Sequence, residues 1–213
     1  VVEDLWAYCF EPKEHPFFRW YFANMYEPQN VLLGIQDDAV VCLTHLNQYE
    51  LNIRGVRFPV SYIVGLATHP AARRSGLGGK LLTASLKEMR RRGQVVHILM
   101  PSKAGFYQQY GYELYCHQWR ETMPLDSLRP LTDRTVRFAF VDSSDRWPYL
   151  DKVYRAYTSG FSGYAYRDEA SWRRHIEAQL AEGNICVVFD GEDPVAYAFF
   201  QLGVSTLQCG EFV

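Results

Sequence analysis

The chain has 213 residues, enough for one large domain or two small ones, and its 48% hydrophobic content gives ample material for a core. A formal net charge of −2 argues against nucleic acid or an anionic membrane as the main partner. The five cysteines are widely spaced without a Cys-x-x-Cys pair, and no run reaches the length of a membrane span, so we expect a cytoplasmic protein with reduced thiols.

The first elements alternate between helical and extended patterns. Residues 1–10 and 15–26 read as helices, the second rich in aromatic residues that either pack in the core or wall a substrate cleft. Strands follow at 31–35 and 40–51, then a hairpin at 52–59 and a buried strand at 62–68. Antiparallel strands followed by strand, helix and strand predict an α/β (α+β) fold with a mixed, mostly antiparallel sheet flanked by helices.

A glycine-containing loop joins the strand at 62–68 to a helix that begins at Leu77. The helix shows apolar residues at helical spacing, namely Leu82, Leu86 and Met89, and Gly93 follows where a C-cap is expected. Free backbone N–H groups and the positive helix end would surround one point between strand and helix, which predicts an anion site for phosphate. The loop residues are Arg73, Arg74, Ser75, Gly76, Leu77, Gly78 and Gly79.

Two common phosphate loops do not fit this stretch. A Walker loop needs glycine at Arg74 and serine or threonine at Leu81, and a dinucleotide fingerprint needs a small residue at Leu81 and an acid near Ile98. The remaining pattern, Arg-x-x-Gly-x-Gly, is met by Arg73, Gly76 and Gly78 and resembles the pyrophosphate loop of the GNAT acetyltransferases. A tight turn without a ligand is the alternative interpretation.

A second motif lies about thirty residues further on, after a strand predicted at 95–100. Residues 106–112 read Phe-Tyr-Gln-Gln-Tyr-Gly-Tyr, similar to the Phe-Tyr-x-x-x-Gly-Phe/Tyr signature of the same superfamily. With Gly-Leu-Ala-Thr-His-Pro at 65–70, the combination resembles the Eis-type (enhanced intracellular survival) branch, over about residues 53–120. The resemblance implies a GNAT fold and acetyl-CoA as cosubstrate.

The resemblance also assigns roles to residues. Backbone groups of Leu66, Ala67 and Thr68 would pair with the pantetheine arm, and Tyr107 would be the general acid that protonates the departing thiolate. A packed aromatic is the alternative for Tyr107, and Tyr110 and Tyr112 are expected in the core. The remaining cofactor contacts would be the loop residues Arg73, Arg74, Ser75, Gly76, Leu77, Gly78 and Gly79, followed by Ser102 and Lys103.

The base that deprotonates the amine is not marked by any motif. An alkyl amine with a pKa of about 10.4 is roughly 4.6 kcal/mol from its neutral form at pH 7. The strand 61–68 has no carboxylate, and the terminal carboxylate thought to reach the site in Eis-type relatives would be missing here. The stand-ins are Glu11, Glu14, Glu50 and His45, the last more typical of a partly buried core histidine. No metal-site or serine-hydrolase motif is present, so we expect no metal.

The second half repeats the element order of the first after a linker at 123–134. A strand at 136–141, helices at 147–157 and 169–181, and strands at 184–190 and 195–204 follow. Aligning Asn30 with Asn184 places 31–35 over 185–189 without a gap, which predicts a GNAT domain at 1–122 and a second, incomplete GNAT-like unit at 135–213 without a cofactor loop. Because Eis-type proteins resemble two such units followed by a sterol-carrier-like domain, we expect the sequence to be truncated at both ends.

These patterns predict an acetyl-CoA-dependent N-acetyltransferase that acts on a primary amine of a small molecule, a polycation included, or on a lysine. The alternative is an acyl-CoA-binding regulatory or structural GNAT-like module with little transferase activity. Neither nucleic acid nor membrane is an expected partner. Eis-type relatives assemble as oligomers, so a homo-oligomer is the arrangement that the resemblance implies.

Overall fold

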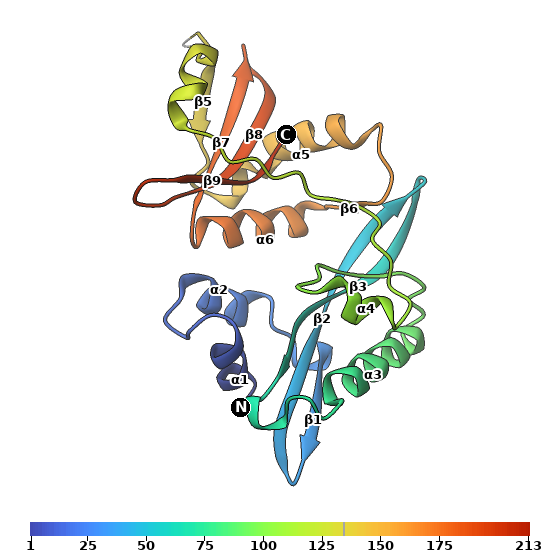
Figure 1. Ribbon diagram of the computed structural model, residues 1–213. Coiled ribbons are helices and arrows are strands. Elements are labelled where there is room, and N and C mark those ends of the chain that lie inside the picture. Colours follow the sequence, from blue (N-terminus) through green and yellow to red (C-terminus); the bar gives the residue numbers. More distant parts are fainter. Residues whose placement is uncertain (134) are drawn as a thin grey trace.

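The computed structural model describes residues 1–133 and 135–213 as two α/β units, drawn one above the other in Figure 1. The sheet of the first unit has the order β1-β2-β3-β4, antiparallel except for the parallel pair β3 and β4. The unit contains α1 (Val2–Cys9), α2 (Pro16–Asn24), η1 (Pro28–Asn30), β1 (Val31–Gln36), β2 (Ala39–Ile53), β3 (Val56–Thr68), η2 (Pro70–Ala72), α3 (Leu77–Arg91), β4 (His97–Leu99) and α4 (Ala104–Gln108).

The second unit has an antiparallel sheet of order β5-β7-β8-β9. Its core is separate from that of the first unit and includes the fully buried Leu150, Trp172 and Ile176. The unit contains η3 (Leu125–Leu131), β5 (Arg137–Phe140), η4 (Ser144–Arg146), α5 (Trp147–Thr158), β6 (Tyr164–Tyr166), α6 (Glu169–Leu180), β7 (Asn184–Asp190), β8 (Asp193–Leu202) and β9 (Leu207–Phe212). Arg134, the last residue of the predicted linker, lies outside the described residues.

The helices and most strands lie where the sequence predicts them, and the mixed α/β class is confirmed. One difference is the start of β3 at Val56, because the turn before it needs only Arg54 and Gly55, both with positive φ. Another is β4, which is confined to three residues of the predicted strand. The sequence did not indicate β6 as a strand.

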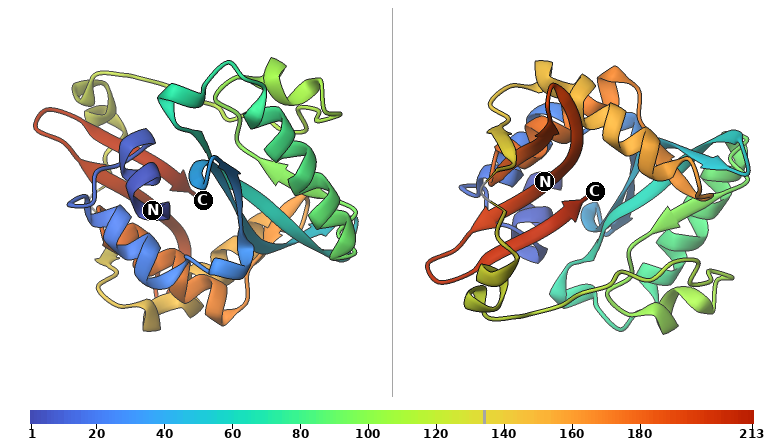
Figure 2. Two further views of the ribbon diagram at one scale, coloured as in Figure 1. Left: turned by 90° about the horizontal axis from the view of Figure 1, so that it is seen from below. Right: turned by 90° about the horizontal axis from the view of Figure 1, so that it is seen from above.

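Strand β6 belongs to the second unit in sequence but to the first sheet in structure. It pairs antiparallel with the far end of β2, with Leu51 opposite Ala165, and the amide of Gly163 donates to the carbonyl of Asn52 at 2.8 Å. The guanidinium of Arg57 lies 4.1 Å from the centre of the Tyr166 ring. This pairing places α6, which follows directly, above the face of the first sheet on which α2 lies (Figures 1 and 2).

A bulge in β3 redirects its side chains. Gly65 has a φ of +62°, and the β2–β3 register shifts beside it, between Leu43 and His45. Before the bulge Ile63 packs in the core under α3, whereas after it Ala67 packs with α1 on the opposite face. Leu66 and Thr68, which alternate with Ala67, therefore face α3 and α4.

The sheet opens beside this bulge. β4 pairs with β3 only along Ser61–Ile63, opposite His97–Leu99, so the edge of β3 beyond Ile63 has no neighbouring strand from β4. Tyr62 and Val64 face α2 and α6, while Leu66 and Thr68 face the other way. The uncovered edge of β3 at this gap therefore carries side chains that point to both faces of the sheet.

Candidate active site

A cavity of about 440 Å³, which we call the loop cavity, lies between the end of β3, the loop before α3, and α4. The structure brings most of the predicted site residues together here. Ala67 and Ser75 are not part of the lining, because Ala67 is buried against α1 and the Ser75 hydroxyl donates to the Ala72 carbonyl at 2.5 Å. The lining consists of Leu66, Thr68, Ala72, Arg73, Arg74, Gly76, Leu77, Gly78, Gly79, Ser102, Lys103, Phe106 and Tyr107.

The backbone of the loop cavity suits an anion. Gly76 begins α3 in the left-handed conformation, with a φ of +78°, and no side chain caps the first turn, whose N–H groups lack intrahelical partners. A Cβ on Gly78 would lie 3.7 Å from the Thr68 hydroxyl and so occupy the cavity wall, and one on Gly79 would collide with the Tyr110 hydroxyl at 2.0 Å. Gly78 therefore leaves room in the cavity wall, whereas Gly79 makes room for the Tyr110 side chain behind it.

Positive side chains complete this surface. Arg73, Arg74 and Lys103 line the cavity, and none of the three has a carboxylate within 4.0 Å in the described part of the chain. Arg73 is oriented by a hydrogen bond of 3.1 Å from its Nε to the Thr68 carbonyl. Free guanidinium and ammonium groups beside an uncapped helix end fit the pyrophosphate of a coenzyme A thioester.

Tyr107 projects from α4 into the loop cavity. Its ring packs against Phe106, with ring centres 5.0 Å apart, and against the core under α3. Burial raises the pKa of the Tyr107 hydroxyl, so the group holds its proton at neutral pH. Tyr110 and Tyr112 pack against the same core, and the Tyr112 hydroxyl is buried without a hydrogen-bond partner in the described structure.

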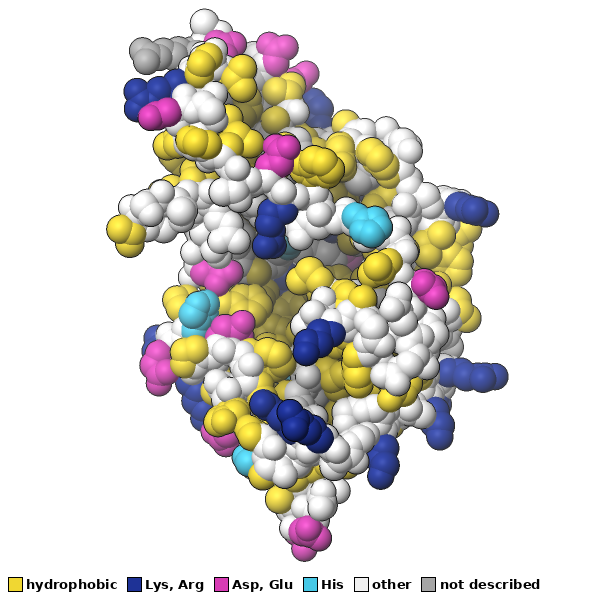
Figure 3. Space-filling view, viewed as in Figure 1, with side chains coloured by type: hydrophobic (Ala, Val, Ile, Leu, Met, Phe, Trp, Pro, Cys, Tyr) yellow, Lys and Arg dark blue, Asp and Glu magenta, His cyan; other side chains and the backbone are white. Residues whose placement is uncertain are grey.

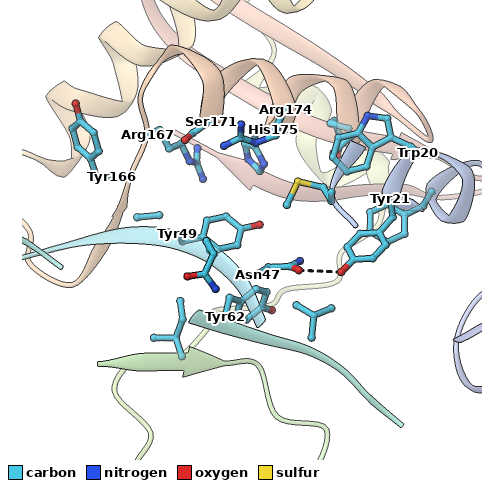
Figure 4. Close-up of a pocket in the computed structure, with 18 of the residues that line it drawn as sticks. Trp20, Tyr21, Asn47, Tyr49, Tyr62, Tyr166, Arg167, Ser171, Arg174 and His175 are labelled. Carbon is cyan, nitrogen blue, oxygen red and sulfur yellow. Dashed lines mark hydrogen bonds between the residues drawn. The ribbon is translucent and has the colours of Figure 1, made fainter. Parts of the chain in front are cut away.

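A second cavity, of about 550 Å³, lies on the opposite face of the sheet between the two units. We call it the interunit cavity; Figure 3 shows the surface hollowed between the units, and Figure 4 shows the side chains that face the space. Its lining comes from four regions of the chain: Phe17, Trp20, Tyr21 and Met25 of α2 and the residue after it; Asn47, Gln48, Tyr49, Leu51, Tyr62, Val64 and Ile98 of the sheet; Ala165, Tyr166 and Arg167 around β6; and Ser171, Arg174, His175, Ala178, Gln179 and Glu182 of α6 and its end.

Glu211 lies behind the wall of this cavity and binds two of the lining residues, Arg167 and His175. Its carboxylate accepts two hydrogen bonds from Arg167, at 2.7 and 2.9 Å, and one from the Tyr197 hydroxyl at 2.6 Å. Burial opposes the charge of Glu211, yet Arg167 and His175 hold the pKa of the carboxyl well below its usual range. Enclosure in turn lowers the pKa of His175, so its contact of 3.3 Å with Glu211 is a hydrogen bond of a neutral ring at neutral pH.

His45 is deeply buried beside the same cavity. The Tyr21 hydroxyl lies 2.8 Å from the Nδ1 atom of His45 and donates a hydrogen bond to Asn47 at 3.1 Å. The Nε2 atom of His45 has no partner in the described structure. Burial lowers the pKa of His45 to about 4, so the ring is neutral at pH 7. The sequence indicated a partly buried core histidine here, and the structure buries it to 1% exposure.

The other candidate bases do not reach the interunit cavity. Glu11 accepts a hydrogen bond from Trp6 at 3.1 Å, and Glu50 lies 3.9 Å from Arg57 on the surface. Glu14 is exposed and outside the lining. Among the described residues, Glu182 is the one carboxylate in the wall of the cavity.

The sequence offered the aromatic helix at 15–26 as one wall of a substrate cleft, and Phe17, Trp20 and Tyr21 do line the interunit cavity, but the sequence did not indicate the other walls. Tyr49, Tyr62, Ser171 and Arg174 line it, yet they lie on three elements with no shared motif. The spacing of Ser171 and Arg174, three residues apart, places both on one helix face. That spacing becomes informative only once β6 is known to bring α6 over the first sheet.

A mixed sheet that opens beside a bulged strand, with a glycine loop at an uncapped helix end, defines the GNAT fold. The chain belongs to the acetyltransferase (GNAT) domain family, whose model matches residues 2–115. A comparison with curated protein sequences gives no match.

Solved structures share this fold. A GCN5-related N-acetyltransferase from Anabaena variabilis is 17% identical, with a TM-score of 0.76 over 100% of this chain and 55% of that one. A GCN5-related N-acetyltransferase from Kribbella flavida is 22% identical (TM-score 0.68; 92% and 47% covered), and Eis1 from Mycobacterium abscessus is 20% identical (TM-score 0.60; 92% and 55% covered). The present chain therefore spans about half the length of these structures.

Two further observations concern metal ligands and membrane-spanning helices. Across residues 1–133 and 135–213, no group of three or more His, Cys, Asp or Glu side chains is placed to hold a metal ion. No helix in the same residues combines the length and the apolar character needed to cross a membrane.

Proposed function

We propose that the chain is an acetyl-CoA-dependent N-acetyltransferase that moves an acetyl group to a primary amine of a small molecule or a lysine. The observation that carries this proposal is the position of the two cavities, which lie on opposite faces of the sheet beside one gap. Leu66 and Thr68, on the part of β3 that β4 does not cover, line the loop cavity together with Tyr107, and Tyr62 and Val64 of the same strand line the interunit cavity. Bound acetyl-CoA would supply an acetyl group activated as a thioester.

Each part of the loop cavity has a role in this proposal. The first-turn amides of α3, with Arg73, Arg74 and Lys103, bind the pyrophosphate. The edge of β3 at Leu66–Thr68, which β4 does not cover, offers backbone groups to the pantetheine arm. The hydroxyl of Tyr107 donates its proton to the sulfur of the leaving group, a step that typically contributes about 10²-fold or more.

Calorimetric titration of the chain with acetyl-CoA tests the proposal. We expect micromolar binding by the wild type and none by a variant that carries both Gly76→Asp and Gly78→Asp, because two carboxylates would occupy and repel the pyrophosphate position. Gly93→Asp is the matched control, since Gly93 has a φ of +75° at the other end of α3 and open space around it. If the folded wild type does not bind acetyl-CoA, the proposal is wrong.

The Eis-type assignment belongs to the proposal as well. It is supported by the motifs at residues 65–70, 73–78 and 106–112 and by the shared fold with Eis1. Cytoplasmic location, the two-domain division at 1–122 and 135–213, and assembly as a homo-oligomer remain predictions.

An acyl-CoA-binding module with little transferase activity is the second candidate function. It is favoured by one observation: in the part of the chain that the structure describes, the interunit cavity holds no carboxylate except Glu182. Release of the CoA thiol in the presence of a panel of amines separates the two candidates, because a binding module would retain acetyl-CoA affinity without amine-dependent release.

A further inference from the structure

We propose that the interunit cavity selects amines that also carry an anionic group, a carboxylate or a phosphonate, and that Arg174 determines this specificity. The inference rests on the proposed function and names the substrate class of the same site. It differs from the polycationic acceptor considered from the sequence, which would require acidic walls.

Arg174 offers a free positive charge to the cavity. Arg174 and Ser171 lie three residues apart on the face of α6 that covers the sheet (Figure 4). Arg174 is exposed at the mouth of the cavity, has no carboxylate within 4.0 Å, and its guanidinium makes no hydrogen bond to another described residue. The Ser171 hydroxyl lies beside the Asp168 carboxylate, and both Ser171 and Arg174 help to lower the pKa of that carboxyl. The neighbouring Arg173 differs, because Asp145 at 2.5 Å and Glu169 at 2.8 Å neutralise it. A planar guanidinium donor without a hydrogen-bond partner suits an incoming carboxylate or phosphonate.

The remaining charges around the cavity offset that of Arg174 only in part. Asp168, the N-cap of α6, is one such charge, because Arg174 contributes to lowering the pKa of its carboxyl, but the two groups form no ion pair within 4.0 Å. Arg167 and Glu211 form a bidentate pair and neutralise each other. His175 is neutral, and Glu182 lies eight residues after Arg174, past the end of α6. Burial raises the pKa of Tyr49 on the floor of the cavity, and the positive charges of Arg174 and Arg167 oppose that rise. The electric field of both guanidinium groups therefore extends to the floor of the cavity.

This charge distribution favours one kind of acceptor. An ammonium group that enters beside this guanidinium is repelled by it, although solvent weakens the repulsion because Arg174 is exposed. An anionic group at Arg174 offsets the repulsion, whereas a second or third ammonium adds to it. A charge-assisted hydrogen bond of this kind corresponds to about tenfold to a hundredfold in affinity.

The test compares amines of matched length. 4-Aminobutyrate, 3-aminopropylphosphonate and butylamine differ only in the terminal group, and spermidine represents a polycation. We expect thiol release with the carboxylate or the phosphonate to exceed that with butylamine and spermidine by about tenfold in kcat/KM, and the better of the two identifies the anion. Arg174→Gln should raise KM for the anionic amines about tenfold or more, with kcat for these amines within about twofold of wild type. The same variant should not raise KM for butylamine, because that amine loses only a repulsive charge.

Arg173→Gln is the control, since it removes a guanidinium from the same helix on its ion-paired side. Wild-type kinetics that favour butylamine or spermidine over both anionic amines would overturn the inference and leave the proposed function in place. So would an Arg174→Gln variant that loses activity equally with butylamine and 4-aminobutyrate, because that pattern indicates a structural role.

A binding measurement keeps the inference testable apart from turnover. Saturation-transfer NMR can follow the binding of 4-aminobutyrate and of butylamine to the wild type and to Arg174→Gln, without acetyl-CoA. Preferential binding of 4-aminobutyrate that disappears in Arg174→Gln supports the inference, even where no amine is acetylated and the proposed function fails. Equal binding of the two amines by the wild type overturns it.

Discussion

At the scale of single residues, Tyr107 is poised to donate a proton. Tyr107 lines the loop cavity, its hydroxyl makes no hydrogen bond to another described residue, and burial raises the pKa of that hydroxyl. We expect Tyr107→Phe to lower kcat about 10²-fold and to leave KM for acetyl-CoA within about twofold, because the proton is needed only as the thiolate departs. Thiol release under saturating substrates measures the effect.

Tyr112→Phe is the matched control for this prediction. The two rings lie 6.0 Å apart, but the Tyr112 hydroxyl is buried without a partner in the described structure. Its removal should leave kcat unchanged and should not lower the free energy of unfolding, because an unsatisfied buried hydroxyl destabilises the folded state. An equal loss of kcat in both variants would indicate that ring packing, rather than the Tyr107 proton, controls the rate.

His45 makes stability depend on pH. Its pKa is about 4 in the folded state and about 6.5 when exposed, so the unfolded chain binds the extra proton below pH 6.5. Stability should therefore decrease as pH falls from about 6.5 to 4, by about 3 kcal/mol from this residue, and level off below that range for this group. Urea unfolding across these pH values measures the slope.

A variant isolates the contribution of His45 from that of other groups. His175 also has a lowered pKa and adds to the decrease. His45→Gln keeps a polar group near Tyr21 but does not titrate, so its pH dependence should be flatter than that of the wild type without disappearing. An unchanged slope would mean that His45 is not neutral in the folded protein.

At the scale of elements, the bulge in β3 determines which residues meet at the gap. Two constraints require glycine at position 65 in this bulge. Its φ of +62° disfavours other residues, and a Cβ there would lie 2.3 Å from the Trp6 ring. Gly65→Ala should lower the free energy of unfolding by about 2–5 kcal/mol, from backbone strain plus overpacking. Chemical denaturation checks the value.

Gly55→Ala separates the two causes. Gly55 has a φ of +79° at the β2–β3 turn, and nothing lies within 4 Å of the position that an added methyl group would take. Its replacement should cost only the strain of the left-handed conformation, about 1–2 kcal/mol. Equal losses at both positions would show that contact with Trp6 does not constrain the bulge.

The sequence predicts some elements well and others not at all, for physical reasons. The loop at 73–79 is predictable because its glycines and the following helix are adjacent in the chain, so one local pattern describes the cavity. Strand β6 is not, because three residues carry little periodicity and their partner in β2 lies more than a hundred residues earlier. The direction of the Ala67 side chain was not predictable without knowledge of the bulge. This side chain faces α1, whereas those of the neighbouring residues face the loop cavity.

At the scale of the whole molecule, the two cavities differ in how they depend on the two units. The loop cavity is built entirely from residues 66–107 of the first unit. The interunit cavity takes its floor from the first unit and its opposite wall from α6 and β6 of the second. The cores are separate too, since the core around Trp172 contains no described residue before Val141. Binding of acetyl-CoA and of the amine should therefore respond differently to damage in each unit.

Trp172→Ala tests this separation. The side chain is fully buried, and its Nε1 donates to Asp151 at 2.8 Å, so the loss should destabilise the second unit by about 3–5 kcal/mol. We expect Kd for acetyl-CoA to stay within about twofold of wild type by calorimetry, while KM for the amine rises about tenfold or more because α6 is no longer held in place.

Leu82→Ala provides the comparison from the first unit. Leu82 is fully buried under α3, in the core against which Tyr107 packs, and its truncation should cost about 2–5 kcal/mol. This variant should weaken acetyl-CoA binding and amine turnover together, since α3 carries the loop cavity and the sheet beneath it forms the floor of the interunit cavity. If Trp172→Ala weakened acetyl-CoA binding as strongly as Leu82→Ala does, the two units would have to fold and bind as one cooperative body, with the β6 pairing transmitting the loss across the sheet.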